Sequence, residues 1–168
     1  MNQSHMRLQP EPPLPGHRLE VLHEELEIRQ RIQELSREIR EKLGDKDPVV
    51  VCVLKGAFVF VADLVRQLDF PFTIDFLRAS SYGDSVVTSG EVKLELDLQQ
   101  SISNRHVLLV EDIVDTGLTL KYLQSNLESR NPASIQICTL LHKPGNNVKL
   151  THIDYCGFEI PNDFVVGY

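Results

Sequence analysis

The apolar run Val49–Leu54, which follows Pro48 directly and is rich in valine, restricts the fold more than any other feature of the sequence. An unbroken run of β-branched side chains next to a turn residue predicts a strand buried on both faces. A second run of this kind covers residues 106–110. Strands buried on both faces are typical of a parallel sheet that is covered by helices on each side.

Hydrophobic spacing predicts the helices that would cover this sheet. Residues 26–43 repeat apolar side chains at intervals of three or four, which places them on one helical face and leaves the charged face to solvent. Similar patterns predict helices at residues 57–68 and 118–129, and strands at residues 72–79, 91–97, 134–141 and 153–158. We therefore predict an α/β fold, a mostly parallel, doubly wound sheet that binds ligands at the carboxyl ends of its strands.

Composition excludes several classes of protein. The 168 residues suit one domain, and 17 Lys and Arg against 24 Asp and Glu give a net charge of −7, which argues against a nucleic-acid partner. The longest apolar stretch, residues 49–64, contains Lys55 and Asp63, so we expect no membrane segment. The first residues lack the apolar core of a secretory signal, and the three cysteines form no C-x-x-C pair, so we expect a cytoplasmic protein.

Residues 107–120, VLLVEDIVDTGLTL, carry the most chemical information. The predicted strand leads into three carboxylates and then into Thr116, Gly117 and Thr119, which open a helix whose first amides suit a phosphate. Carboxylates repel phosphate by about 1 kcal/mol per close pair even in water, so they must face another group, such as a sugar diol or Mg²⁺. The segment therefore predicts a ribose 5-phosphate pocket. A simple acidic cap on the helix would explain one acid but not three.

The stretch VEDIVDTGLTL resembles the phosphoribosyl diphosphate (PRPP) signature of the type I phosphoribosyltransferases. The Asp directly before Thr-Gly resembles the 6-oxopurine branch, the bacterial hypoxanthine phosphoribosyltransferases. The likeness continues through VLKGAFVFVADL, FLRASSYGDSVVTSGEVK, CTLLHKPG and GFEIPNDFVVGY, and so covers nearly all of the chain after residue 17. It implies the type I phosphoribosyltransferase fold with a flexible lid loop.

This resemblance implies an enzyme of purine salvage. It would transfer the 5-phosphoribosyl group of PRPP to hypoxanthine and guanine, giving IMP or GMP and pyrophosphate, with Mg²⁺ as cofactor. Relatives are homodimers or homotetramers, so we expect a homo-oligomer.

The resemblance also implies which residues hold PRPP. Glu111 and Asp112 would bind the ribose hydroxyls and Mg²⁺. The 5-phosphate would lie in the backbone cradle of Asp115, Thr116, Gly117, Leu118 and Thr119. Pyrophosphate would be bound by Leu54, Lys55 and Gly56, where the family often has a cis peptide bond before the lysine. Ser81 and Tyr82 would belong to a lid within residues 80–90.

The base pocket is implied in the same way. Asp115 would exchange a proton with purine N7 and Lys143 would donate to O6, which makes these two the catalytic residues. Ile113 and Phe164 would cover the two faces of the base, and backbone groups of Val165 would meet its edge. A donor at O6 with an acceptor at N7 selects 6-oxopurines, so adenine should be a poor substrate.

Two departures from the family pattern stand out. The chain ends at Tyr168, where the family continues with a Gly-x-Asp-Tyr segment and an arginine, so we expect a domain at residues 17–168 that is truncated at its C-terminus. Asn146 lies in a stretch where many relatives have an arginine. Residues 1–16, with four prolines among polar residues, are expected to be a disordered arm or a cloning remnant.

Two other functions stay open at this point. A haloacid-dehalogenase-type phosphatase needs Asp-x-Asp, whereas Asp112 and Asp115 are separated by two residues. A non-catalytic regulator on the same fold, sensing a nucleotide or binding RNA, would not need Asp115 and Lys143.

Overall fold

The computed structural model of the chain describes residues 20–81, 92–146 and 152–167. The predicted arm at residues 1–16 and Tyr82 of the predicted lid lie outside these ranges. In chain order the elements are α1 (Glu25–Leu43), β1 (Val49–Leu54), α2 (Phe58–Val65), β2 (Thr73–Ser81), β3 (Val92–Leu96), β4 (His106–Val114), α3 (Leu118–Glu128), β5 (Ser134–His142), the 3₁₀ turn η1 (Pro144–Asn146) and β6 (Tyr155–Glu159).

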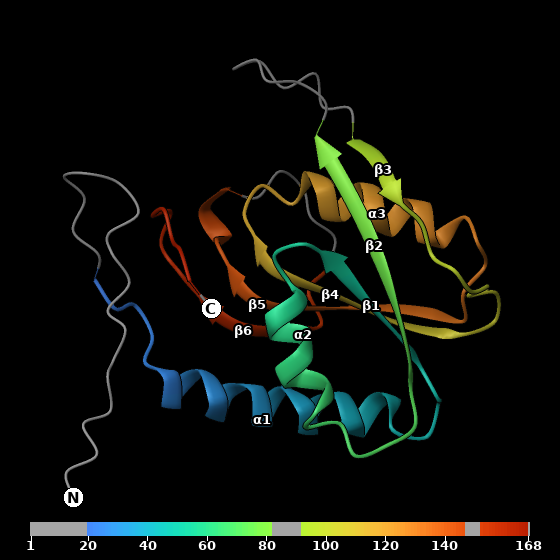
Figure 1. Cartoon of the computed structure of the whole chain (residues 1–168), viewed down its shortest axis with the longest axis horizontal. Helices are drawn as coiled ribbons and strands as arrows, with labels where there is room; N and C mark the ends of the chain where they lie inside the picture. Colours follow the sequence, from blue (N-terminus) through green and yellow to red (C-terminus); the bar gives the residue numbers. More distant parts are fainter. Residues whose placement is uncertain (1–19, 82–91, 147–151, 168) are drawn as a thin grey trace, which may run out of the picture.

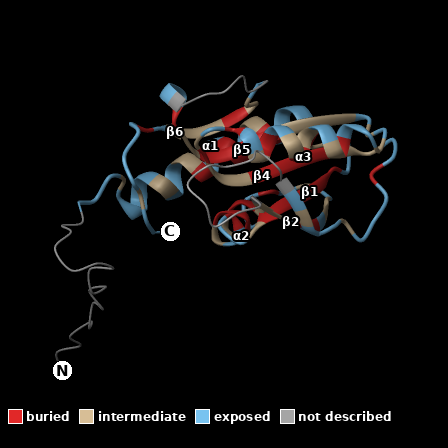
Figure 2. Ribbon diagram, turned by 90° about the horizontal axis from the view of Figure 1, so that it is seen from above, coloured by how far each residue is buried: buried red, intermediate tan, exposed pale blue. Residues whose placement is uncertain are grey.

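The six described strands form one sheet in the order β3-β2-β1-β4-β5-β6 (Figure 1). Every pairing is parallel except that of β3 with β2 at the edge. The predicted mostly parallel sheet is confirmed. Buried strands occupy its centre: all of β1 except Leu54 is buried, and so are four consecutive residues of β4 (Figure 2).

Alternate residues of the central strands point into two separate hydrophobic cores. Val50 and Cys52 of β1 face the core that is closed by α1 and α2. Val49 and Val51 face the opposite core, which is closed by α3. Helices therefore cover both faces of the sheet, as the sequence predicts, and no described helix is long and apolar enough to cross a membrane.

Strand β4 is longer than the sequence predicts. It continues past Val110 because its backbone keeps pairing with β5, where Glu111 lies opposite Thr139 and Ile113 opposite Leu141. Two of the three carboxylates therefore lie within the strand rather than in a turn that follows it. Strand β2 likewise extends through Ser81, into the predicted lid.

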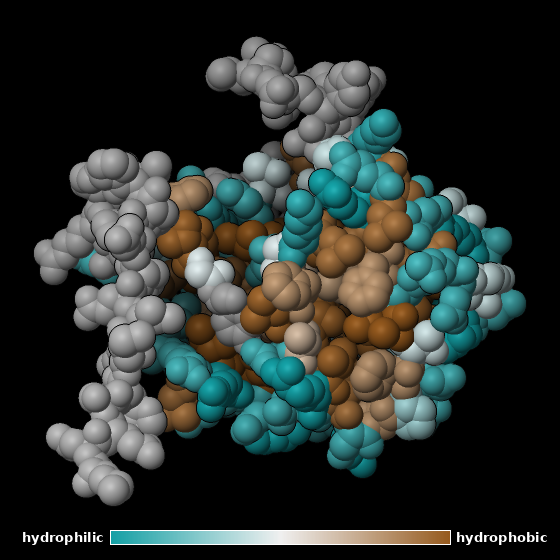
Figure 3. Space-filling view, in the orientation of Figure 1, coloured by the Kyte–Doolittle hydropathy of each residue, from teal (hydrophilic) through white to brown (hydrophobic). Residues whose placement is uncertain are grey.

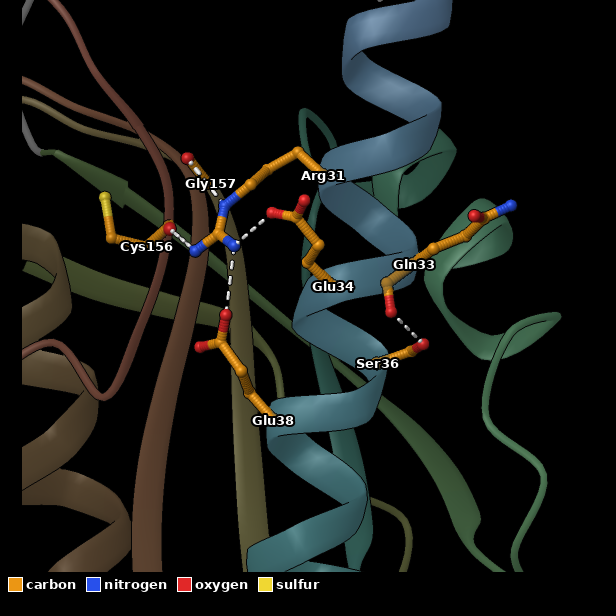
Figure 4. A network of polar contacts seen from close by, with 7 residues as sticks. All are labelled: Arg31, Gln33, Glu34, Ser36, Glu38, Cys156 and Gly157. Atoms are coloured by element: carbon orange, nitrogen blue, oxygen red, sulfur yellow. Dashed lines mark hydrogen bonds and ion pairs between the residues drawn. The ribbon is translucent and has the colours of Figure 1, made fainter.

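The charged face of α1 is not wholly solvated, because Arg31 reaches across to the edge strand β6 (Figure 4). Its guanidinium donates to the backbone oxygens of Cys156 at 2.7 Å and Gly157 at 3.0 Å, and it also bonds to Glu34 and Glu38 on its own helix. Charge-assisted bonds of this kind are stronger than neutral ones. The bonds of Arg31 thus link α1 to β6. Strand β6 precedes the predicted base-binding segment.

Candidate functional site

The candidate site lies where β1, β4 and β5 end. In a parallel sheet these carboxyl ends meet at one edge, so segments that are far apart in the sequence become neighbours there. Residues 54–56 follow β1, residues 111–119 span the end of β4 and the start of α3, and Lys143 follows β5.

The residues of the predicted phosphate cradle lie at the junction between β4 and α3. Gly117 precedes α3 with a φ of 74°, a left-handed conformation that glycine adopts without steric cost. The turn lines a partly open cavity of about 110 Å³, which can receive a phosphate-sized group. The residues lining this cavity are Glu111, Ile113, Val114, Asp115, Thr116, Gly117, Thr119 and Leu120. Leu118 is exposed and does not line it.

The acid pair, Glu111 and Asp112, is crowded and partly buried. Burial raises the pKa of Glu111 well above its usual range, and the neighbouring Asp112 carboxyl raises it further. The N–H of Ile113 donates to Oδ1 of Asp112 at 2.8 Å, which limits rotation of that carboxyl. Two crowded carboxylates favour a cation or hydroxyl donors beside them.

The acid pair also fits Mg²⁺. The described residues contain no group of three or more His, Cys, Asp or Glu that could hold a metal ion by itself. Mg²⁺ commonly takes only one or two carboxylates from the protein and completes its shell with water and substrate phosphate oxygens.

The predicted pyrophosphate loop, residues 54–56, lies next to this pair. The Leu54–Lys55 peptide bond is cis, as the family resemblance implies. Lys55 and Gly56 are exposed at the end of β1, and the Asp112 carboxyl packs against Gly56.

Lys143 and Asp115 come together although 27 residues separate them in the chain. Nζ of Lys143 lies 3.4 Å from Oδ2 of Asp115, and the Lys143 side chain is only 8% exposed against 48% for Asp115. The backbone N–H of Lys143 donates to the Val114 oxygen at 2.9 Å, which continues the β4–β5 pairing to this point. The buried Lys143 ammonium therefore lies beside the half-exposed Asp115 carboxylate, which places a hydrogen-bond donor next to an acceptor.

The rest of the predicted base pocket is more open. Ile113 is partly buried in the cavity wall. Phe164 is 89% exposed, and Val165 is partly buried in the segment after β6 that has no regular structure. The side chain of Ser81 and all of Tyr82 lie outside what the structure describes, so the lid prediction stays a prediction.

Sequence reasoning missed Thr139, which is fully buried in β5 opposite Glu111. Its hydroxyl donates to the Leu141 oxygen at 2.9 Å and lies 3.4 Å from the Asp112 oxygen. It therefore helps to fix the backbone beneath the acid pair. A threonine in an apolar strand gives no sign of such a role until the strand register is known.

Comparison with known proteins agrees with this geometry. The model of the family "Phosphoribosyl transferase domain" matches residues 19–168. The chain is 46% identical over 166 residues to hypoxanthine-guanine phosphoribosyltransferase of Mycobacterium avium, covering 95% of this chain and 82% of that protein. It is 44% identical over 155 residues to hypoxanthine phosphoribosyltransferase of Haemophilus influenzae, covering 90% and 87%. Its fold matches the crystal structure of a hypoxanthine phosphoribosyltransferase from Staphylococcus aureus with a TM-score of 0.85 at 40% identity, covering 89% of this chain and 81% of that one.

Proposed function

Because the chain belongs to the phosphoribosyl transferase domain family, we propose that it is a purine-salvage enzyme of the hypoxanthine-guanine type. It transfers the 5-phosphoribosyl group from PRPP to hypoxanthine or guanine and releases IMP or GMP and pyrophosphate. The observation that carries this proposal is the Lys143–Asp115 pair beside the phosphate cradle.

The pair suits a 6-oxopurine. Lys143 donates to the O6 atom and Asp115 takes the proton from N7 as the new bond to ribose forms. Because Lys143 is buried, its charge acts in a medium of lower dielectric constant, where electrostatic interactions are stronger. A 6-amino group would present a donor to the Lys143 donor, so the hydrogen bond that the lysine makes to O6 could not form.

The PRPP side uses backbone amides and carboxylates. The turn from Asp115 to Thr119 holds the 5-phosphate through its amides and the N-terminus of α3. Glu111 and Asp112 accept hydrogen bonds from the two ribose hydroxyls. The loop containing Lys55 and Gly56 binds the pyrophosphate that departs.

Glu111 and Asp112, together with oxygens of PRPP, are also the groups that would hold Mg²⁺. When bound, this ion supplies Lewis-acid neutralisation of the leaving group. The crowded acid pair is the structural feature that supports this assignment.

The direct test measures base consumption with hypoxanthine, guanine, xanthine or adenine, each with and without PRPP and Mg²⁺. We expect PRPP-dependent turnover of hypoxanthine and guanine, little of adenine, and loss of turnover when Mg²⁺ is chelated. Equal use of adenine would refute the role of Lys143. No turnover of any base, with tight binding of nucleotide or RNA, would indicate the regulator, which no feature of the site favours.

We also propose that the chain forms a homodimer or homotetramer in the cytoplasm. Apolar side chains are exposed on the α2 face of the sheet, and Figure 3 shows this apolar surface over α2 and β2. Ile74 and Phe76, two residues apart on β2, are 39% and 38% exposed and pair in register with Val50 and Cys52 of the core on that face. The exposed apolar side chains of this surface are Phe58, Ile74 and Phe76. An apolar surface of this kind supports the proposed assembly.

Light scattering after size-exclusion chromatography tests the assembly. We expect two or four times the mass of one chain for the wild type, and a smaller mass for Phe76→Asp with an unchanged far-ultraviolet circular dichroism spectrum. A wild-type mass of one chain contradicts the proposal.

A further inference from the structure

The absence of a side chain at Gly56 leaves room for the Asp112 carboxyl. A β-carbon at this position would lie 2.0 Å from Oδ2, 2.6 Å from Cγ and 3.0 Å from Oδ1 of Asp112. All three nearest atoms belong to that one carboxyl group. Van der Waals contact between such atoms requires about 3.5 Å, so the two groups cannot both keep their positions.

Backbone conformation does not explain this glycine. Gly117 and Gly167 are the described glycines with positive φ, and Gly56 is not among them. An L-residue could therefore adopt the backbone of residue 56, and only the approach of Asp112 demands glycine. The two glycines of the site are thus required for different reasons, Gly117 for conformation and Gly56 for space.

Asp112 has little freedom to move aside. Its Oδ1 accepts the N–H of Ile113 at 2.8 Å, and its backbone oxygen lies 3.4 Å from the buried Thr139 hydroxyl. Displacement of the carboxyl from Gly56 therefore strains or breaks its hydrogen bond with the N–H of Ile113.

We infer that Gly56 is a positioning residue that acts through Asp112. Because residue 56 has no side chain, the Asp112 carboxyl, which in the proposed function binds the ribose, can pack against the pyrophosphate loop. The pyrophosphate loop and the acid pair consequently set each other's position. The inference rests on the proposed function for its effect on PRPP but not for the contact itself.

A double-mutant cycle on stability tests the contact independently of activity. Gly56→Ala is expected to lower Tm by about 4 °C in the wild-type background, given that overpacking costs about 1 to 3 kcal/mol and a chain of this size loses about 2 to 4 °C per kcal/mol. In the Asp112→Ala background, where the carboxyl is gone, Gly56→Ala is expected to change Tm by less than about 1 °C. In the Asp112→Asn background, which keeps the volume without the charge, the decrease returns.

Gly145→Ala is the matched control, because a β-carbon there meets no atom within 4 Å and Tm should stay unchanged. Equal Tm decreases for Gly56→Ala in the wild-type and Asp112→Ala backgrounds would overturn the inference, as would no decrease in either.

Kinetics then test the consequence. Gly56→Ala is expected to raise the KM for PRPP by about tenfold, an effect of about 1.4 kcal/mol, and the KM for hypoxanthine by less than about threefold. Equal increases in both constants would overturn the positioning role. If the wild type shows no PRPP-dependent turnover, the proposed function fails, whereas the Tm cycle still decides whether the contact exists.

Discussion

The two sides of the candidate site are built differently. The phosphate side consists of backbone at the junction of β4 and α3, where Gly117 is buried and lines a partly open cavity. The base side depends on side chains, of which Lys143 is buried but Phe164 is 89% exposed. The conformation of the backbone on the phosphate side is fixed once the sheet and α3 have folded. Phe164, in contrast, lies on a segment without regular structure, and its exposed ring can contact a ligand. Substitutions on the two sides should therefore separate effects on PRPP, on the base and on stability.

The largest effect is expected where the two sides meet, at Asp115. Asp115→Asn should lower kcat by about 10² to 10⁴, because the amide cannot take the purine proton, while the KM for PRPP changes only a few-fold. Steady-state kinetics with each substrate varied will measure both constants. Equal losses in kcat and in PRPP affinity would remove the proton-transfer role. Asp115→Glu, which keeps the carboxylate, serves as the comparison.

On the phosphate side, Gly117→Ala should affect folding and PRPP binding together. The left-handed backbone costs an L-residue about 1 to 2 kcal/mol, so Tm should fall by about 4 °C. The KM for PRPP should rise and that for hypoxanthine should not. A higher hypoxanthine KM with unchanged PRPP KM would contradict the division into two sides.

On the base side, Phe164→Ala should weaken binding of the base and leave folding and PRPP binding nearly unchanged. Stacking on an aromatic ring contributes about 1 to 3 kcal/mol, so the KM for hypoxanthine should rise by about tenfold. Because the ring is 89% exposed, the free energy of unfolding should change by no more than about 0.5 kcal/mol. Phe164→Tyr, which keeps the ring, should bind the base normally. Urea denaturation and kinetics on the same preparations will separate the two effects.

The smallest effect is expected far from both sides, at Asp97. Its carboxylate lies 2.7 Å from the Arg130 guanidinium, which holds the pKa of Asp97 below its usual value, with help from the N–H of Leu98. A lowered pKa stabilises the fold above about pH 4, and that contribution is lost as the pH falls through the lowered value. Since the pair is partly exposed, Asp97→Asn should cost less than about 1 kcal/mol at pH 7.

Urea denaturation from pH 7 to pH 3 should show the difference between Asp97→Asn and wild type shrinking toward zero. Neither KM should change. A difference that grows as the pH falls would mean that the ion pair is not its source.

Much of this architecture can be predicted from local patterns. The buried run Val49–Leu54 and the helical spacing of residues 26–43 both appear in the structure as expected, because the apolar period decides which face of an element can be buried. The turn that opens α3 was also predictable, since Thr116 and Gly117 shape the backbone next to them in the chain. The end of β4 was not, because Glu111 belongs to the strand only through its pairing with β5.

The sequence by itself therefore determined the fold class, the turn that opens α3 and the types of acid and base available. The tertiary structure decided which distant residues are in contact. Lys143 lies beside Asp115, Gly56 packs against the Asp112 carboxyl, and Arg31 bonds to the edge strand β6. The physical reason is the distance along the chain over which each interaction acts. Backbone propensity and hydrophobic period act between residues a few positions apart, whereas these contacts depend on the register of parallel strands, which only the packed sheet sets.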